Sequence, residues 1–90
     1  MEIILLDGAR LCRREEAMEL LDRALALPNW WGRNLDALYD CLTGMGRPTR
    51  LVLRRRRVME ATPFGSRLLR VLRDAAQNTP WLELVDEETE

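Results

Sequence analysis

Apolar residues along this chain gather in three short segments with the pattern of β-strands. Glu2 to Leu6 contains four consecutive apolar residues, the pattern of a parallel strand covered on both faces, as in the centre of a sheet. Arg50 to Arg54 (RLVLR) is a short apolar segment with charged ends. Trp81 to Val85 (WLELV) alternates apolar and polar residues. These segments predict three strands.

Between the strands, apolar residues recur at the three- and four-residue spacing of helices. This spacing predicts helices over about Arg13 to Ala26, Leu35 to Thr43 and Gly65 to Gln77. A single helical turn is expected after the arginine run Arg54 to Arg57, stopped by Pro63 because proline cannot continue a helix. The order of elements is therefore strand, two helices, strand, one short and one long helix, strand.

Each connection between strands is long enough to join parallel neighbours, and such connections are overwhelmingly right-handed. We therefore predict an α/β fold in which a three-stranded parallel sheet packs with about three to four helices. Residues 1–90 are expected to form a single domain, and residues 86–90 (DEETE) a frayed acidic tail.

The length and composition are those of a soluble globular protein, with 90 residues, 47% hydrophobic and 32% charged. No apolar run is long enough to span a bilayer, and the start MEIILLDG lacks the basic region and cleavage site of a signal peptide. We expect a cytoplasmic protein that is a monomer when free and has no membrane partner.

Two residue types that are common in enzyme active sites are missing. There is no histidine and no lysine, which removes the commonest general base and the Schiff-base amine. Cys12 and Cys41 are expected to be free thiols, since disulfides are rare in a reducing compartment. The chain has no glycine-rich phosphate loop and no metal-ligand spacing. We therefore predict no enzymatic activity, no metal and no cofactor.

The predicted helix from Leu35 to Thr43 has an unusual polar face. Asn34 is a good N-cap, and Gly44 is the expected stop, in a left-handed conformation. Asp36 and Asp40 lie four residues apart, so they are neighbours on the side opposite the apolar stripe. Such like-charge pairs destabilise a helix, which favours a function for the pair, although a solvated helix face is the common alternative.

The loop before this helix carries two adjacent tryptophans, Trp30 and Trp31. Adjacent rings on a short loop seldom both find a core pocket, so at least one is expected to be exposed, and Trp31 is the candidate for core packing. Trp81, in a strand, is expected in the core. An aromatic anchor beside carboxylates on a rigid helix is typical of a protein-binding site for a basic partner.

The segment ALPNWWGRNLDALYDCLTG, residues 26–44, closely resembles the signature of the barstar family, intracellular inhibitors of bacterial extracellular ribonucleases. A proline, an aromatic pair, glycine, asparagine and the helix L-D-A-L-aromatic-D-C-L-T-G follow in the family's order, and weaker similarity covers most of the remaining chain. The resemblance implies a barstar-like fold. It also implies a protein inhibitor that plugs the active site of a basic, barnase-type ribonuclease or related toxin and protects the producing cell.

By this resemblance, Asp40 enters the phosphate site of the enzyme, Asp36 pairs with basic groups beside it, and Trp30 packs against the catalytic histidine. Asp74, on the last helix, matches an acidic residue that reaches a peripheral basic group. The partner-binding residues that the resemblance implies are Trp30, Gly32, Asn34, Asp36, Tyr39, Asp40, Thr43, Gly44 and Asp74.

Three departures from the family pattern are candidate determinants of specificity. Arg33 stands where the best-known member has an acid, Met45 replaces an aromatic residue, and Arg47 adds positive charge beside the acidic face. A cognate nuclease with an acidic group opposite Arg33 would be one explanation. We do not use the resemblance to predict a cis peptide bond before Pro48.

Two alternatives remain open. The chain could be an immunity or regulatory protein of the same fold, whose partner is a different toxin or not a ribonuclease. Arg54 to Arg57 could instead bind RNA phosphates. The run has no aromatic residues between its arginines for base stacking, and a solvated charge run also protects a sheet edge, so nucleic acid is the weaker alternative.

Overall fold

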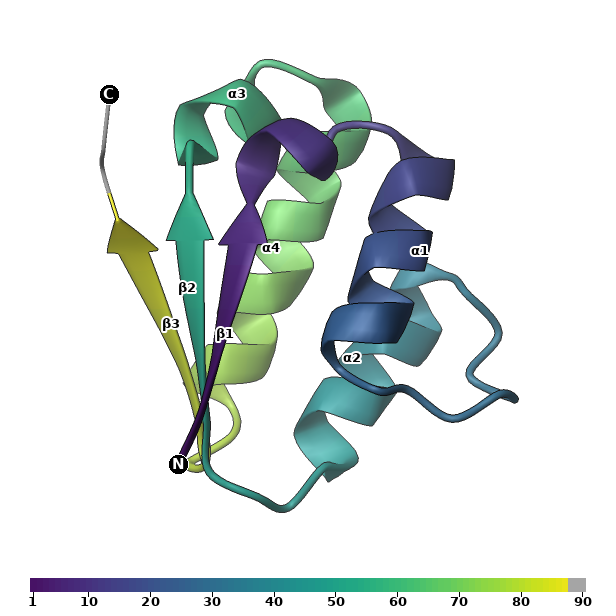
Figure 1. Ribbon diagram of the computed structural model, residues 1–90, viewed down its shortest axis with the longest axis vertical. Coiled ribbons are helices and arrows are strands. Elements are labelled where there is room, and N and C mark those ends of the chain that lie inside the picture. Colours follow the sequence, from purple (N-terminus) through teal and green to yellow (C-terminus); the bar gives the residue numbers. More distant parts are fainter. Residues whose placement is uncertain (88–90) are drawn as a thin grey trace.

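The computed structural model describes residues 1–87, and it contains one sheet of three parallel strands. The strands are β1 (Glu2–Asp7), β2 (Thr49–Arg54) and β3 (Leu82–Glu87), and they lie side by side in that order (Figure 1). In the register of the sheet, Leu51 of β2 lies between Ile4 of β1 and Leu84 of β3. The predicted three-stranded parallel sheet is confirmed.

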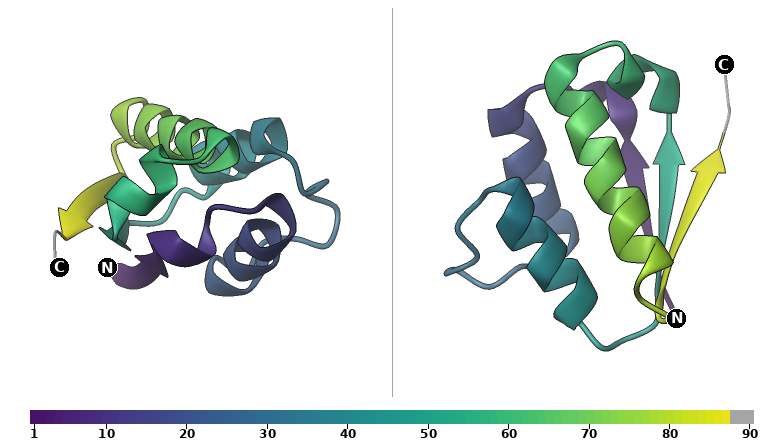
Figure 2. Two further views of the ribbon diagram at one scale, coloured as in Figure 1. Left: turned by 90° about the horizontal axis from the view of Figure 1, so that it is seen from above. Right: turned by 180° about the vertical axis from the view of Figure 1, so that it is seen from behind.

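Helices lie in both connections between the strands. The 3-10 helix η1 (Gly8–Arg10), α1 (Arg14–Ala24) and α2 (Leu35–Gly44) join β1 to β2, and α3 (Arg56–Glu60) and α4 (Pro63–Gln77) join β2 to β3. Figure 2 shows these helices gathered on one side of the sheet. The α/β fold with four α-helices agrees with the prediction.

The core lies between this covered face of the sheet and the helices. Alternate residues of β1 and β2, such as Leu6 and Leu51, point into it and are fully buried. Leu68 and Leu72, one turn apart on α4, meet them from the helical layer. The apolar residues whose spacing predicted the helices are therefore the residues that pack against one face of the sheet.

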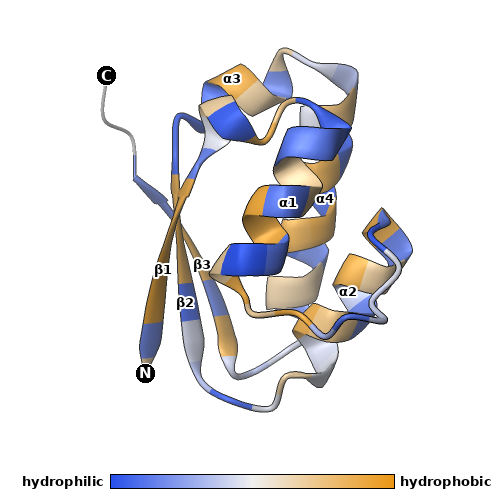
Figure 3. Cartoon of the chain, turned by 45° about the vertical axis from the view of Figure 1, so that its right-hand side comes forward, coloured by the Kyte–Doolittle hydropathy of each residue, from blue (hydrophilic) through white to orange (hydrophobic). Residues whose placement is uncertain are grey.

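The expectation that β1 is covered on both faces is wrong. β2 is the central strand, and Ile3 and Leu5 of β1 are 59% and 60% exposed. Figure 3 shows β1 at the edge of the sheet, apolar through its middle and hydrophilic at its N-terminal end. Because both connections place their helices on the same side, no helix or strand of residues 1–87 covers the other face of the sheet, even though β1 carries apolar residues there.

Two predicted element ends also differ. Gly44 is the last residue of α2, and the left-handed turn falls two residues later at Gly46, with φ 72°. Pro63 does not stop a helix but begins α4, where its missing N–H costs nothing, and the side chain of Thr62 accepts a hydrogen bond from the Gly65 N–H at 3.1 Å.

The predicted start of the frayed tail, at residue 86, is wrong, because the last strand continues to Glu87. Asp86 and Glu87 are the last residues of β3 and form ion pairs with Arg56 and Arg54, respectively. Residues 88–90 lie outside the described part of the chain. Trp81 precedes β3 and is only partly buried against the core.

Candidate protein-binding site

The loop that carries the two tryptophans leaves α1 by a well-defined turn. Ala26 is left-handed, with φ 50°, and the Leu27 N–H donates to the carbonyl oxygen of Asp22 at 3.2 Å. A left-handed residue followed by this six-residue hydrogen-bonded ring is the Schellman arrangement that ends many helices. It directs Leu25 and Leu27, 1% and 9% exposed, back into the core and fixes the start of the loop.

The two tryptophans have opposite environments. Trp31 is 2% exposed and belongs to the core cluster, whereas Trp30 is 81% exposed. The Trp31 N–H donates to the carbonyl oxygen of Pro28 at 3.1 Å, which closes a tight turn around the pair. The prediction that at least one ring is exposed is confirmed. Trp31 anchors the loop to the core and leaves Trp30 projecting from its surface.

Backbone conformation and an ion pair hold the end of the loop. Gly32 and Arg33 are both left-handed, with φ 81° and 51°. Asn34 then caps α2, as predicted, by accepting a hydrogen bond from the Ala37 N–H at 2.8 Å. The Arg33 guanidinium contacts the carboxylate of Asp22 on α1 at 2.8 Å. The loop is thus tied to α1 and to α2.

Asp36, Asp40 and Gly44 form one row along α2, because residues four apart lie on the same side of a helix. Leu38 and Leu42 on the opposite side are fully buried, and both aspartates are exposed. Among residues 1–87, neither aspartate forms an ion pair. The row therefore presents two uncompensated carboxylates on a helix that the core holds in place.

One flank of this row meets α4. The Tyr39 hydroxyl accepts a hydrogen bond from the side-chain amide of Asn78 at 3.0 Å, and the Thr43 hydroxyl donates to the carbonyl oxygen of Tyr39 at 2.9 Å. Asp74 is exposed and lies one helical turn before Asn78, on the same side of α4. This contact joins the acidic row to the α4 surface that carries Asp74.

The other flank contains Cys41, Met45 and Arg47. Cys41 is a half-buried free thiol, and burial, followed by the nearby charge of Asp40, raises its pKa above the ordinary value. A thiol with a raised pKa is a poor nucleophile, so the surroundings of Cys41 indicate a residue that packs rather than one that reacts. Met45 packs against the core, and the Arg47 guanidinium contacts Glu2 of β1 at 3.2 Å.

The structure thus brings together eight of the residues predicted from the sequence, and Asp74 lies at the side of their surface. We call this surface the α2 face. It consists of Trp30, Gly32, Asn34, Asp36, Tyr39, Asp40, Thr43 and Gly44. The sequence did not indicate the supporting residues Asp22 and Asn78, because each contacts this face through a tertiary interaction with no local signature.

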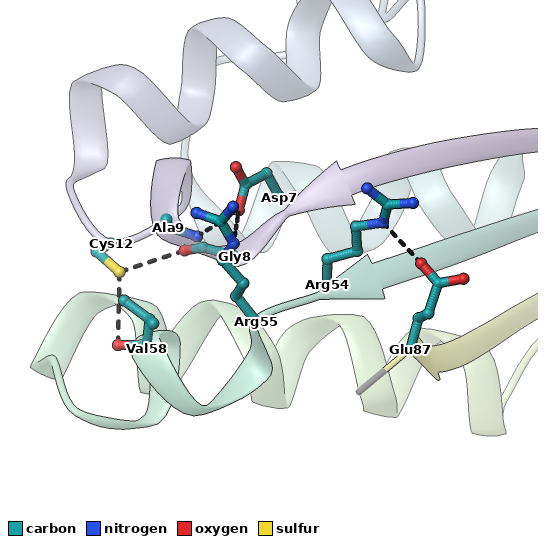
Figure 4. A network of polar contacts seen from close by, with 8 residues as sticks. All are labelled: Asp7, Gly8, Ala9, Cys12, Arg54, Arg55, Val58 and Glu87. Carbon is teal, nitrogen blue, oxygen red and sulfur yellow. Dashed lines mark hydrogen bonds and ion pairs between the residues drawn. The ribbon is translucent and has the colours of Figure 1, made fainter. Parts of the chain in front are cut away.

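The arginine run offers a second candidate surface, at the carboxyl end of the sheet (Figure 4). Arg54 contacts Glu87 at 2.6 Å and Arg55 contacts Asp7 at 3.8 Å. Arg56 contacts Asp86 at 3.1 Å. Three arginines of the run therefore have acidic neighbours within the chain, which lowers the positive charge available to a nucleic acid phosphate.

Within residues 1–87, no cluster of three or more metal-ligating side chains occurs, and no helix has the length and apolar content needed to cross a membrane. The bond before Pro48 is trans, as are all described peptide bonds.

Comparison with known proteins identifies the family. The family model described as Barstar (barnase inhibitor) matches residues 1–89. The chain belongs to the barstar family. A similar protein from Bacillus subtilis (strain 168), named "Putative ribonuclease inhibitor YrdF", is 44% identical over 55 residues, a match that spans 60% of each protein. The description of this family, an inhibitor of barnase, agrees with the prediction that the chain is not an enzyme.

Proposed function

We propose that this barstar family member inhibits a ribonuclease by inserting its α2 face into the active site of the enzyme. The observation that carries this proposal is the pair of uncompensated carboxylates, Asp36 and Asp40, on a fixed helix beside the exposed Trp30. We further propose that the enzyme is a basic, barnase-type ribonuclease and that binding protects the cell that produces it.

The chemistry of the enzyme explains the need for this arrangement. A ribonuclease holds a phosphodiester in a positive pocket, and a carboxylate imitates one phosphate group. In the complex, Asp40 occupies the phosphate site and forms charge-assisted hydrogen bonds with arginine or lysine side chains there. Asp36 pairs with basic groups beside this site, Trp30 packs against the catalytic histidine, and Asp74 reaches a basic group at the periphery.

The fixed geometry of the α2 face favours tight binding. Association normally loses free energy when loops and side chains become ordered. Here Trp31 and the contact between Arg33 and Asp22 already hold the loop, and Asn34 caps the helix. Gly44 has no side chain at the end of the acidic row, so the backbone of the partner can approach closely there.

The test is a titration of a barnase-type ribonuclease with the purified protein, comparing wild type with Asp40→Asn. This substitution keeps the size of the side chain and removes its charge. Leaving the cations of the phosphate site unpaired in a buried interface costs about 3–5 kcal/mol, so we expect a loss of affinity of roughly 10²- to 10³-fold or more. Glu15→Gln, an equally conservative change at an exposed acid on α1, is the control and should inhibit like wild type.

A sharp endpoint near one inhibitor per enzyme for wild type, with at least about 10²-fold weaker binding by Asp40→Asn, would support the proposal. Equal inhibition by Asp40→Asn and wild type would contradict the role of Asp40. A folded wild-type protein that leaves the ribonuclease fully active would refute the barnase-type partner and favour a different toxin. Because charges steer the encounter, we also expect the association rate to fall as salt is added.

A further inference from the structure

A hollow of about 290 Å³ opens between the tryptophan loop and the last turn of α2. Its apolar lining includes Leu25, Leu27 and Pro28 from the loop and Met45 from the end of α2. Trp30 and Asp40 line the same hollow, so it adjoins the acidic row directly. We call it the Trp30 pocket.

The walls of the Trp30 pocket are fixed by the fold. Leu25 and Leu27 belong to the buried core cluster, and the turn at Ala26 sets the path of the chain between them. Met45 packs against the same core from the other side. An apolar cavity with preformed walls favours occupation by an apolar group, because such a group leaves water without a large cost of rearrangement.

The charges at the pocket limit what fills it. Arg47 lines the pocket, but its guanidinium contacts Glu2 at 3.2 Å, so much of its charge is already balanced. Asp40 forms no ion pair within residues 1–87. The net attraction at this place is therefore for a cation at Asp40 with an apolar group beside it.

We infer that the Trp30 pocket receives one apolar side chain of the partner, of leucine to phenylalanine size, from the segment that presents a cation to Asp40. This inference rests on the proposed function and adds to it a determinant of partner choice. The hollow, of about 290 Å³, has room for one such side chain, and its apolar lining lies directly beside Asp40. Large anchors that fill pockets near charged contacts dominate many protein interfaces.

Filling the pocket from within the inhibitor tests the inference. Pro28→Trp adds an indole ring beside the pocket without changing charge, and Val58→Trp, at an exposed position on α3, is the matched control. Both variants are first checked for wild-type unfolding curves. With a barnase-type ribonuclease as the probe, we expect Pro28→Trp to raise Kd at least about tenfold, mainly through faster dissociation, and Val58→Trp to leave it unchanged.

A double-mutant cycle separates a blocked pocket from general disturbance. Each exposed apolar residue of the nuclease near its active site is changed to alanine and measured against wild type and Pro28→Trp. One of these changes should weaken binding to wild type and have little further effect on Pro28→Trp. If Pro28→Trp is misfolded, methyl NMR of Leu27 replaces it, and new contacts between Leu27 and partner protons are expected on binding.

The outcomes distinguish the two proposals. If wild type inhibits, Asp40→Asn binds much more weakly, and Pro28→Trp binds within twofold of wild type, the pocket is not an anchor and only the inference is overturned. Additive losses in every cycle would overturn it in the same way. If wild type itself does not bind the nuclease, the proposed function fails and the inference fails with it.

Discussion

The adjacent tryptophans allow stability and binding to be separated by two neighbouring substitutions. Trp31 is 2% exposed, so Trp31→Ala should lower the free energy of unfolding by about 3–5 kcal/mol, the usual cost of truncating a buried aromatic residue. Trp30 is 81% exposed, which leaves roughly a fifth of an aromatic side chain of about 150–250 Å² in contact with the protein. At about 25 cal/mol per Å², Trp30→Ala should cost no more than about 1 kcal/mol.

A third variant tests the reason for the cost at Trp31. Its indole N–H is buried and has no hydrogen-bond partner within the described structure. Trp31→Phe removes this unpaired donor together with part of the ring, so the two effects oppose each other. We expect it to lose less than half of what Trp31→Ala loses.

The assay is urea unfolding followed by far-UV circular dichroism, because fluorescence would change with each tryptophan removed. Free energies come from linear extrapolation, with the slope m checked for each variant. The same samples are titrated against the ribonuclease. Trp30→Ala should be folded and bind weakly, whereas Trp31→Phe should bind nearly as well as wild type. A loss of more than about 2 kcal/mol at Trp30, or less than about 1 kcal/mol for Trp31→Ala, would refute the assignment of the two rings.

Three further substitutions test other parts of the fold by the same measurements. Gly8→Ala should destabilise by about 2–3 kcal/mol or more, because its Cβ would lie 2.5 Å from a backbone oxygen; a variant as stable as wild type would contradict this close approach. Gly44→Ala, whose Cβ would meet no atom within 4 Å beyond its neighbouring residues and the backbone of its own helix, should stabilise α2 by up to about 1 kcal/mol yet weaken inhibition; unchanged inhibition would exclude close approach at Gly44. Asn34→Ala should cost about 1 kcal/mol through loss of the N-cap, and no change in the unfolding midpoint would argue against the cap.

The parts of the fold that local chemistry determines were predictable from the sequence. Asn34 caps α2 as predicted, because a cap depends on the side chain and the next three residues. The position of β1 was not predictable in the same way. Four consecutive apolar residues predict a strand, but whether helices cover one face or two depends on how all the connections pack.

The site shows the same division between local and tertiary information. The row of Asp36 and Asp40 follows from helical periodicity, which the sequence displays directly. Which of two adjacent tryptophans enters the core depends on the loop backbone, and the contact between Tyr39 and Asn78 joins residues 39 positions apart. Neither leaves a pattern that short-range spacing could reveal.

The structure also changes the interpretation of the two arginines that depart from the family pattern. In the sequence, Arg33 and Arg47 add positive charge next to a face that should attract a basic enzyme. In the structure, Arg33 contacts Asp22 at 2.8 Å and Arg47 contacts Glu2 at 3.2 Å, so each arginine has a negative neighbour outside the acidic row. The attraction of Asp40 for a cation is therefore weakened less than net charge suggests. Since these ion pairs are partly exposed, each contributes at most about 1 kcal/mol to stability, and the contact between Arg33 and Asp22 ties the tryptophan-bearing loop to α1.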